Sequence, residues 1–149
     1  MRNVESKQVV VFRLGNERYG FPIDQVNEII RYIAPTRMPN VPDYMEGIVG
    51  LRGKVLAAID LRTLLGMDKK EADGNTKIII ASEENMGFIV DDVDMIVTPK
   101  DEEADSAAGL PGYIDRSFVA RLLKTNGEII IVLNMLSMLN IKEKTKAAV

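Results

Sequence analysis

The side chains that could do chemistry in this sequence of 149 residues are carboxylates, lysines, hydroxyls and amides, because it contains neither cysteine nor histidine. That double absence excludes disulfides, structural zinc fingers, thiol nucleophiles and imidazole acid–base catalysis. The densest carboxylate groups are Asp91-Asp92-Val93-Asp94 and the run at 101–105. Such groups can serve as an acid–base pair or as oxygen ligands of Ca²⁺ or Mg²⁺.

Neither acidic group has the spacing of an established motif. The group at 91–94 lacks the glycine and the closing glutamate of a calcium loop, and the run at 101–105 precedes a stretch rich in glycine and proline. We therefore expect both groups on the solvated surface, with a carboxylate-dependent metal hydrolase using Asp91, Asp92 and Asp94 as an alternative. No serine has a histidine to serve as its base, and no glycine loop has a phosphate-binding pattern. The sequence predicts no enzyme, no bound metal and no cofactor.

Composition and charge point to a protein of the cytoplasm. The formal charge is −3 and the isoelectric point is near 5.1, whereas nucleic-acid binders normally carry a concentrated basic surface. The longest apolar run, Ile129 to Leu133, is far shorter than the roughly 18 residues needed to cross a bilayer. We expect a cytoplasmic protein with no nucleic-acid partner and no insertion into the membrane.

Short runs of branched apolar residues dominate the chain and predict strands. Examples are 9–12, 78–80 and 129–132, each bounded by polar residues or glycine. Such runs suit strands that are buried on both faces or that line a small closed barrel. Helices are expected to be few and short, at Asp24–Arg31, Leu61–Gly66 and Met135–Asn140.

The sequence contains an internal duplication. The segment 53–66 recurs without a gap 74 residues later, and the segment 20–30 aligns with 87–97. The chain therefore divides into two similar halves, about 8–70 and 76–141, joined by a polar stretch. Each half is near the lower size limit for a core of its own, so their apolar faces are expected to pack together along a seam. Asp24, Asp60 and Asn134 are predicted to cap the short helices.

Arg52 lies between glycines at the tip of a predicted hairpin, where packing does not require an arginine. Its guanidinium suits a carboxylate partner, and Glu28, on the polar side of Val26, Ile29 and Ile30, is a candidate. The alternatives are a solvated arginine in an ordinary turn and apolar side chains that belong to the core.

Four motifs follow one another in a fixed order: Gly20–Ile30, Met38-Pro39, Gly47–Gly53 and Ile59–Gly66. With these motifs the chain resembles the CheW family of bacterial chemotaxis coupling proteins, from about residue 8 to residue 140. The resemblance implies a mainly β fold of two intertwined SH3-like five-stranded β-barrels with a few short helices. It implies one domain over 8–141, built of the two repeats with strands that can exchange at the joint, and a flexible tail at 142–149.

The resemblance also implies a function. Such a protein is a non-enzymatic adaptor that couples the cytoplasmic tip of methyl-accepting chemoreceptors to the regulatory domain of the histidine kinase CheA, in arrays at the inner membrane. A hydrophobic groove between the barrels would hold the receptor, an ion pair between Glu28 and Arg52 would fix that groove, and Arg62 would be a further rim charge. By position, the receptor-binding residues would be Val26, Glu28, Ile29, Ile30, Gly47 and Arg52.

Two further interpretations stay open beside the adaptor and the metal hydrolase. One is a CheV-like adaptor or a kinase regulatory domain of the same fold, which the start of the chain at Met1, just before the first strand, disfavours. The other is a structural homo-oligomer formed by pairing of edge strands.

Overall fold

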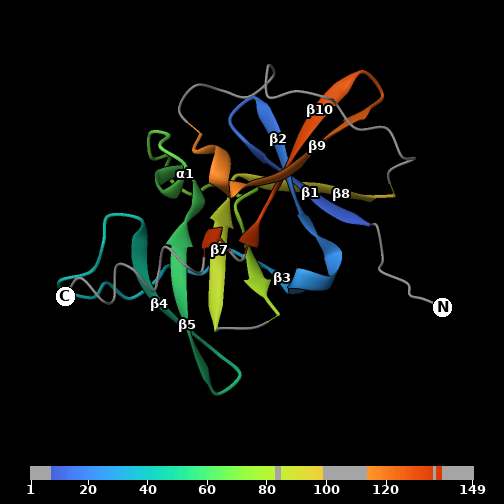
Figure 1. Cartoon of the computed structure of the whole chain (residues 1–149). Coiled ribbons are helices and arrows are strands. Elements are labelled where there is room, and N and C mark those ends of the chain that lie inside the picture. The colour runs from blue at the N-terminus through green and yellow to red at the C-terminus, as the bar shows by residue number, and fades with distance from the viewer. Residues whose placement is uncertain (1–7, 83–84, 99–113, 136, 139–149) are drawn as a thin grey trace.

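The computed structural model describes residues 8–82, 85–98, 114–135 and 137–138. The fold is mainly β, with two five-stranded sheets and very little helix (Figure 1), as the sequence predicted. The strands are β1 (Val9–Leu14), β2 (Glu17–Pro22), β3 (Val26–Arg31), β4 (Met45–Leu51), β5 (Lys54–Asp60), β6 (Lys77–Ala81), β7 (Met86–Val90), β8 (Asp92–Val97), β9 (Val119–Thr125) and β10 (Glu128–Leu133). The helical elements are α1 (Leu61–Leu64) and the 3₁₀ turns Ile23–Gln25 and Arg116–Phe118.

Each sheet takes strands from both sequence halves. The first sheet has the order β8-β1-β2-β10-β9 and the second has the order β3-β6-β7-β5-β4. The second sheet closes on itself because Thr36, beyond the end of β3, forms two backbone hydrogen bonds with Ile48 of β4, at 2.8 and 2.9 Å. We call this closed sheet the second barrel.

The largest buried cluster fills the space between the two sheets. It joins Phe12 and Phe21 of the first sheet to Ile79 and Phe88 of the second, and the rings of Phe21 and Phe88 lie 5.3 Å apart. Two smaller clusters lie within the individual sheets, one of them formed by Val49, Leu56, Ala58, Ile78, Ile80 and Ile89 of the second barrel. In the described part of the chain, the expected seam is therefore occupied by the main core.

The predicted helix over Asp24–Arg31 is wrong, since most of this segment is strand β3. A β-bulge after Val26 places Val26 and Ile29 on the same face of the second sheet, opposite Ala81 and Ile79 of β6, which belong to the main core. This bulge produces apolar spacing that resembles a helix, although branched side chains favour a strand. Only one 3₁₀ turn precedes it, and Asp24 lies inside that turn while Pro22 occupies the N-cap, so Asp24 is not a cap.

The two other predicted caps differ from each other. Asp60 occupies the N-cap position of α1, but its side chain forms no capping bond to the helix backbone and instead accepts a hydrogen bond from the Thr63 hydroxyl at 2.7 Å. Asn134 accepts a bond from the Ser137 N–H at 3.4 Å, as a cap does. The end of the predicted helix at 135–140 lies outside the described residues.

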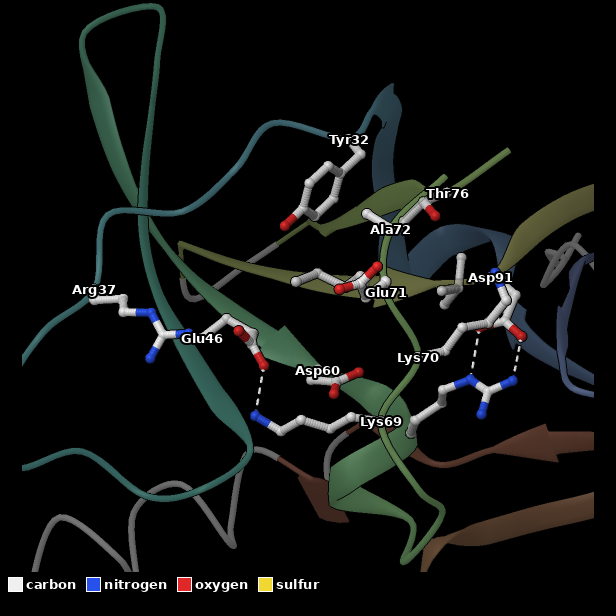
Figure 2. A pocket seen from close by; sticks show the side chains of 13 residues that line it. Tyr32, Arg37, Glu46, Asp60, Lys69, Lys70, Glu71, Ala72, Thr76 and Asp91 are labelled. Carbon is white, nitrogen blue, oxygen red and sulfur yellow. Dashed lines mark hydrogen bonds and ion pairs between the residues drawn. The ribbon is translucent and has the colours of Figure 1, made fainter. Parts of the chain in front are cut away.

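The carboxylate of Asp60 is almost fully buried, being 8% exposed, and it points into a cavity (Figure 2). Burial raises the pKa of Asp60 above its ordinary 3.8, and the hydrogen bond from Thr63 only partly opposes this. The folded state therefore binds this proton more tightly than the unfolded state. The contribution of Asp60 to the free energy of unfolding must fall as the pH rises from about 3.8 through the folded-state pKa.

We expect Asp60→Asn to leave the free energy of unfolding at pH 7 within about 0.5 kcal/mol of the original, or to raise it, because the amide retains the Thr63 bond without a buried charge. Urea titrations at pH 4 and pH 7 measure this. A large loss of stability at pH 7 would show that the charge itself holds the fold.

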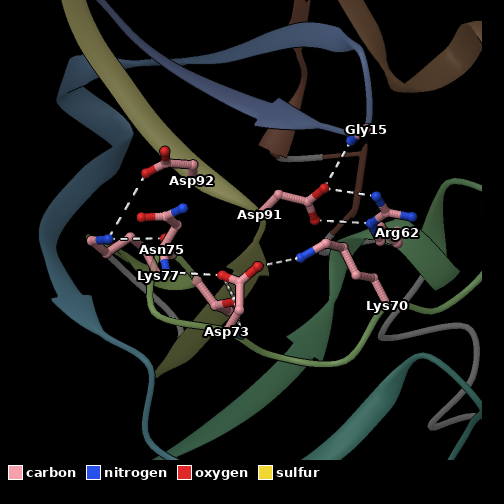
Figure 3. A network of polar contacts seen from close by, with 9 residues as sticks. Gly15, Arg62, Lys70, Asp73, Asn75, Lys77, Asp91 and Asp92 are labelled. Atoms are coloured by element: carbon pink, nitrogen blue, oxygen red, sulfur yellow. Dashed lines mark hydrogen bonds and ion pairs between the residues drawn. The ribbon is translucent and has the colours of Figure 1, made fainter.

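A nearly buried ion pair connects the two sheets (Figure 3). The Arg62 guanidinium, in α1, donates two bonds of 2.8 and 2.7 Å to Asp91, which lies where the chain crosses from β7 to β8. The Gly15 N–H, in the β1–β2 turn, donates to the same carboxylate at 2.8 Å. The side chains of Arg62 and Asp91 are 14% and 16% exposed, so the expectation that Asp91 is solvated was wrong.

This connection is expected to stabilise the fold. Burial raises the pKa of Asp91, but the Arg62 guanidinium and the Gly15 N–H lower it more, so the pKa lies below its ordinary 3.8. The resulting stability is present above that value and is lost as the pH falls below it. We expect Asp91→Asn to lower the free energy of unfolding at pH 7 by about 3 kcal/mol, measured by urea titration.

Asp92→Asn is the matched control, because Asp92 is 39% exposed and its contact with Lys77 is 3.8 Å long. It should cost less than about 1 kcal/mol. Equal losses for the two variants would mean that Arg62 and Asp91 do not connect the sheets.

Candidate partner-binding groove

A groove of about 380 Å³ lies on the second barrel, between strand β3, the β4–β5 hairpin and the end of β6. Apolar side chains line part of it, and charged side chains stand among them. The lining residues are Asn27, Glu28, Leu51, Arg52, Lys54, Leu56, Ile80, Ala81, Ser82 and Asn85. All of them belong to the second barrel and its turns, so this groove does not lie between the two sheets.

The predicted ion pair between Glu28 and Arg52 is present at this groove. The Arg52 guanidinium donates to the Glu28 carboxylate, and both side chains line the groove. Glu28 is in β3, one edge of the second sheet, and Arg52 is at the tip of the hairpin that contains the other edge strand, β4. The ion pair therefore connects β3 with the tip of the β4–β5 hairpin, where the backbone hydrogen bonds of the sheet do not join them.

The backbone of Arg52 adopts a left-handed conformation that arginine rarely takes. Arg52 and Gly53 have φ values of 49° and 80°, the left-handed pair of a type I′ hairpin turn. Their equivalents in the second repeat, Asn126 and Gly127, have φ values of 51° and 80°. Asparagine tolerates this conformation better than arginine does, so the first repeat keeps an arginine at some cost to the turn.

Gly47 is close to this site but does not line the groove. Its φ is +146°, and a Cβ atom there would lie 2.1 Å from the Thr36 carbonyl oxygen. The adjacent bridge between Thr36 and Ile48 closes the second barrel. Gly47 therefore allows the second barrel to close, and this closure positions the β4–β5 hairpin and Arg52.

The remaining predicted receptor residues lie on two faces of β3. Glu28 and Ile30 pair with Ile80 and Ile78 on the inner face of the second barrel, where Ile30 is partly buried. Val26 and Ile29 are on the opposite face, which looks towards the first sheet; Val26 packs against the main core and Ile29 is 37% exposed. Neither of the two is fully enclosed.

The sequence did not indicate several residues that line the groove, and the predicted position of Arg62 at its rim is wrong. Lys54 and Leu56 follow Arg52 along the hairpin, and the register that pairs Leu51 with Lys54 could have indicated them. Ile80 reaches the groove because β6 pairs with β3, and Asn85 reaches it because the residue after it begins β7, which pairs with β5; no local pattern reveals either pairing. Arg62 is not a rim charge, since it is committed to Asp91.

The acidic group at 91–94 does not form a common site. Asp91 pairs with Arg62, Asp92 with Lys77, and Asp94 with both Arg13 and Arg18. Asp94 is only 12% exposed, so it too was wrongly expected to be solvated. Among the described residues no cluster of three or more acidic side chains could hold a metal ion, and the run at 101–105 lies outside them. In the same part of the chain, no helix has both the length and the apolar character needed to span a membrane.

Comparison with known proteins decides the family. A model of the CheW-like domain matches residues 8–143. The chain belongs to the CheW family. The chemotaxis protein CheW of Bacillus subtilis (strain 168) is 30% identical over 146 residues, which is 96% of this chain and 92% of that protein. CheW of Rhizobium meliloti (strain 1021) is 29% identical over 143 residues, covering 95% and 92%.

A solved structure of the family has the same fold. The scaffolding protein TtCheW from Thermoanaerobacter tengcongensis superposes with a TM-score of 0.77 at 32% sequence identity, over 87% of this chain and 89% of that chain. Proteins of the CheW family are non-enzymatic adaptors, and this chain has that class of function, a chemotaxis adaptor and scaffold.

Proposed function

We propose that this chain, in the cytoplasm, couples the tips of chemoreceptors to the histidine kinase CheA and holds the receptor hairpin against the second barrel. The observation that carries the proposal is the Glu28–Arg52 ion pair beside an open groove. Its arginine is kept in a backbone conformation that suits asparagine better. A side chain retained at such a cost at the surface is typical of a binding site.

The groove and the nearby edge of β3 supply the two kinds of contact that a helical hairpin needs. Leu51, Leu56 and Ile80 offer apolar surface for an aliphatic side chain of the partner, which contributes affinity. Arg52 and Lys54 offer charge at the margin, which contributes register and selectivity. Ile29, exposed on the opposite face of the edge strand β3, offers a separate apolar contact on the side of the first sheet.

An adaptor without an active site can transmit a signal only by differential binding. It must bind one arrangement of receptor and kinase more tightly than another, because equal affinity for both shifts no equilibrium. The proposal therefore requires that the receptor and the kinase occupy separate surfaces and bind at the same time.

Reconstitution with purified components tests this function. Immobilised CheA should retain a receptor hairpin fragment only when this chain is added. The variant Arg52→Glu should retain the kinase contact and lose the receptor fragment. Its matched control is Lys124→Glu, a charge reversal on the equivalent hairpin of the first sheet, which should retain both. Failure of the chain to bridge the two components would refute the proposal.

A further inference from the structure

A second cavity, of about 340 Å³, lies between the second barrel and the polar joint at 67–76 (Figure 2). None of the residues that line the groove lines this cavity. Its walls include Tyr32, Glu46, Asp60, Lys69, Ile89 and Val90. Polar groups and apolar side chains thus meet in one concave site, which is the usual composition of a binding pocket.

The charge that distinguishes this cavity is the carboxylate of Asp60, which points into it (Figure 2) and is 8% exposed. The Thr63 hydroxyl donates to it, but among the described residues none forms an ion pair with it. The nearest cation, Lys69, donates its bond to Glu46 at 2.8 Å. The pKa values of Tyr32 and Asp60 are both raised, first by burial and also by the nearby carboxylate of Glu46.

The second repeat has no charge at the position equivalent to Asp60. In the second repeat the equivalent of Asp60 is Asn134, a neutral side chain that performs the capping bond. The side chain of Asp60 forms no capping hydrogen bond of normal geometry with the backbone of α1. A buried carboxylate that forms no direct ion pair is unfavourable, Lys69 offsets this cost only from a distance, and a cation bound at Asp60 would reduce it further.

We infer that this cavity binds one basic side chain of a protein partner, with its guanidinium or ammonium group at Asp60. Ile89 and Val90 can contact the methylene groups of such a side chain. Tyr32 also lines the cavity, and an aromatic ring can favour a positive charge. Four cations also line the cavity: Arg37, Arg62, Lys69 and Lys70. Three of them form ion pairs with carboxylates other than Asp60, namely Arg62 with Asp91, Lys69 with Glu46 and Lys70 with Asp73.

Titration of the full chain, followed by NMR of its backbone amides, tests the inference. The probes are ethylguanidinium chloride and its neutral isostere ethylurea at equal ionic strength. Ethylguanidinium should give saturable shifts at Asp60 and Thr63, and ethylurea should give none. N-acetyl-L-argininamide should bind at least as tightly as ethylguanidinium if a protein side chain is the natural ligand. Binding of the small cation alone would overturn that assignment.

The variants complete the test. Asp60→Asn should weaken ethylguanidinium binding at least tenfold, while Glu28→Gln, in the separate groove, should leave it unchanged. Shifts that rise linearly without saturation, equal shifts with ethylurea, or unchanged binding by Asp60→Asn would each overturn the inference. The comparison of the two probes with the original chain stands even if Asp60→Asn does not fold. Neither the receptor nor the kinase takes part, so the result is independent of the proposed coupling.

Discussion

Replacing Gly47 with valine is expected to abolish binding of the receptor hairpin and to lower the free energy of unfolding by about 3 kcal/mol. The reason is steric. A Cβ atom at this position would lie 2.1 Å from the Thr36 carbonyl oxygen, and the backbone has a φ of +146° that branched residues rarely adopt. Relief of this clash requires the loss of the Thr36–Ile48 bridge that closes the second barrel. Urea titration measures the stability, and a binding titration with the receptor fragment measures the function.

Gly50→Val is the matched control in the same strand. A Cβ atom at Gly50 would have no neighbour within 4 Å, so this variant should stay within about 1 kcal/mol of the original stability. A Gly47→Val variant as stable as Gly50→Val would contradict the role of Gly47 in closing the barrel.

The second large effect is expected from the ion pair at the groove. Arg52→Glu would place two carboxylates together, and Glu28→Arg would place two guanidinium groups together. Each single reversal should weaken receptor binding at least tenfold, because like charges force the hairpin away from β3. The double variant Glu28→Arg/Arg52→Glu restores opposite charges and should recover most of the binding. Absence of any recovery would count against the ion pair as the element that fixes the groove.

The variant Arg52→Asn separates the effect of residue 52 on the stability of the turn from its effect on receptor binding. Asparagine is the residue at the equivalent position 126, where the backbone has nearly the same φ. The variant should therefore be at least as stable as the original chain and still bind the receptor fragment more weakly. Thermal unfolding and the same binding titration measure both properties. Unchanged receptor binding would show that the arginine side chain is not part of the interface.

Much of the fold could be predicted because the sequence repeats itself and its strands are compact runs of branched residues. The repeat register even places Arg52 and Asn126 in matching turns. The error at β3 has a local cause: the bulge after Val26 shifts the side chains by one position, and the apolar spacing then resembles that of a helix.

The candidate site was only partly predictable. Arg52 and Glu28 could be paired from their chemistry and from the family resemblance. The residues around them could not, since Ile80 and Asn85 reach the groove through the pairing of β6 with β3 and of β7 with β5, strands far apart in the sequence. The acidic residues Asp91 and Asp94 look like surface charges in the sequence, but each meets a cation from a distant element and is largely buried.

The most direct test of the account is the affinity of Ile29→Lys for the receptor hairpin and for CheA, measured in separate titrations. Ile29 is 37% exposed on an edge strand, so a lysine should be tolerated there without unfolding. Ile129→Lys, at 38% exposure on the first sheet, is the control for receptor binding. The account predicts at least a tenfold loss of receptor affinity and less than a twofold change in kinase affinity for Ile29→Lys. Equal losses for both partners, or no loss for the receptor, would contradict it.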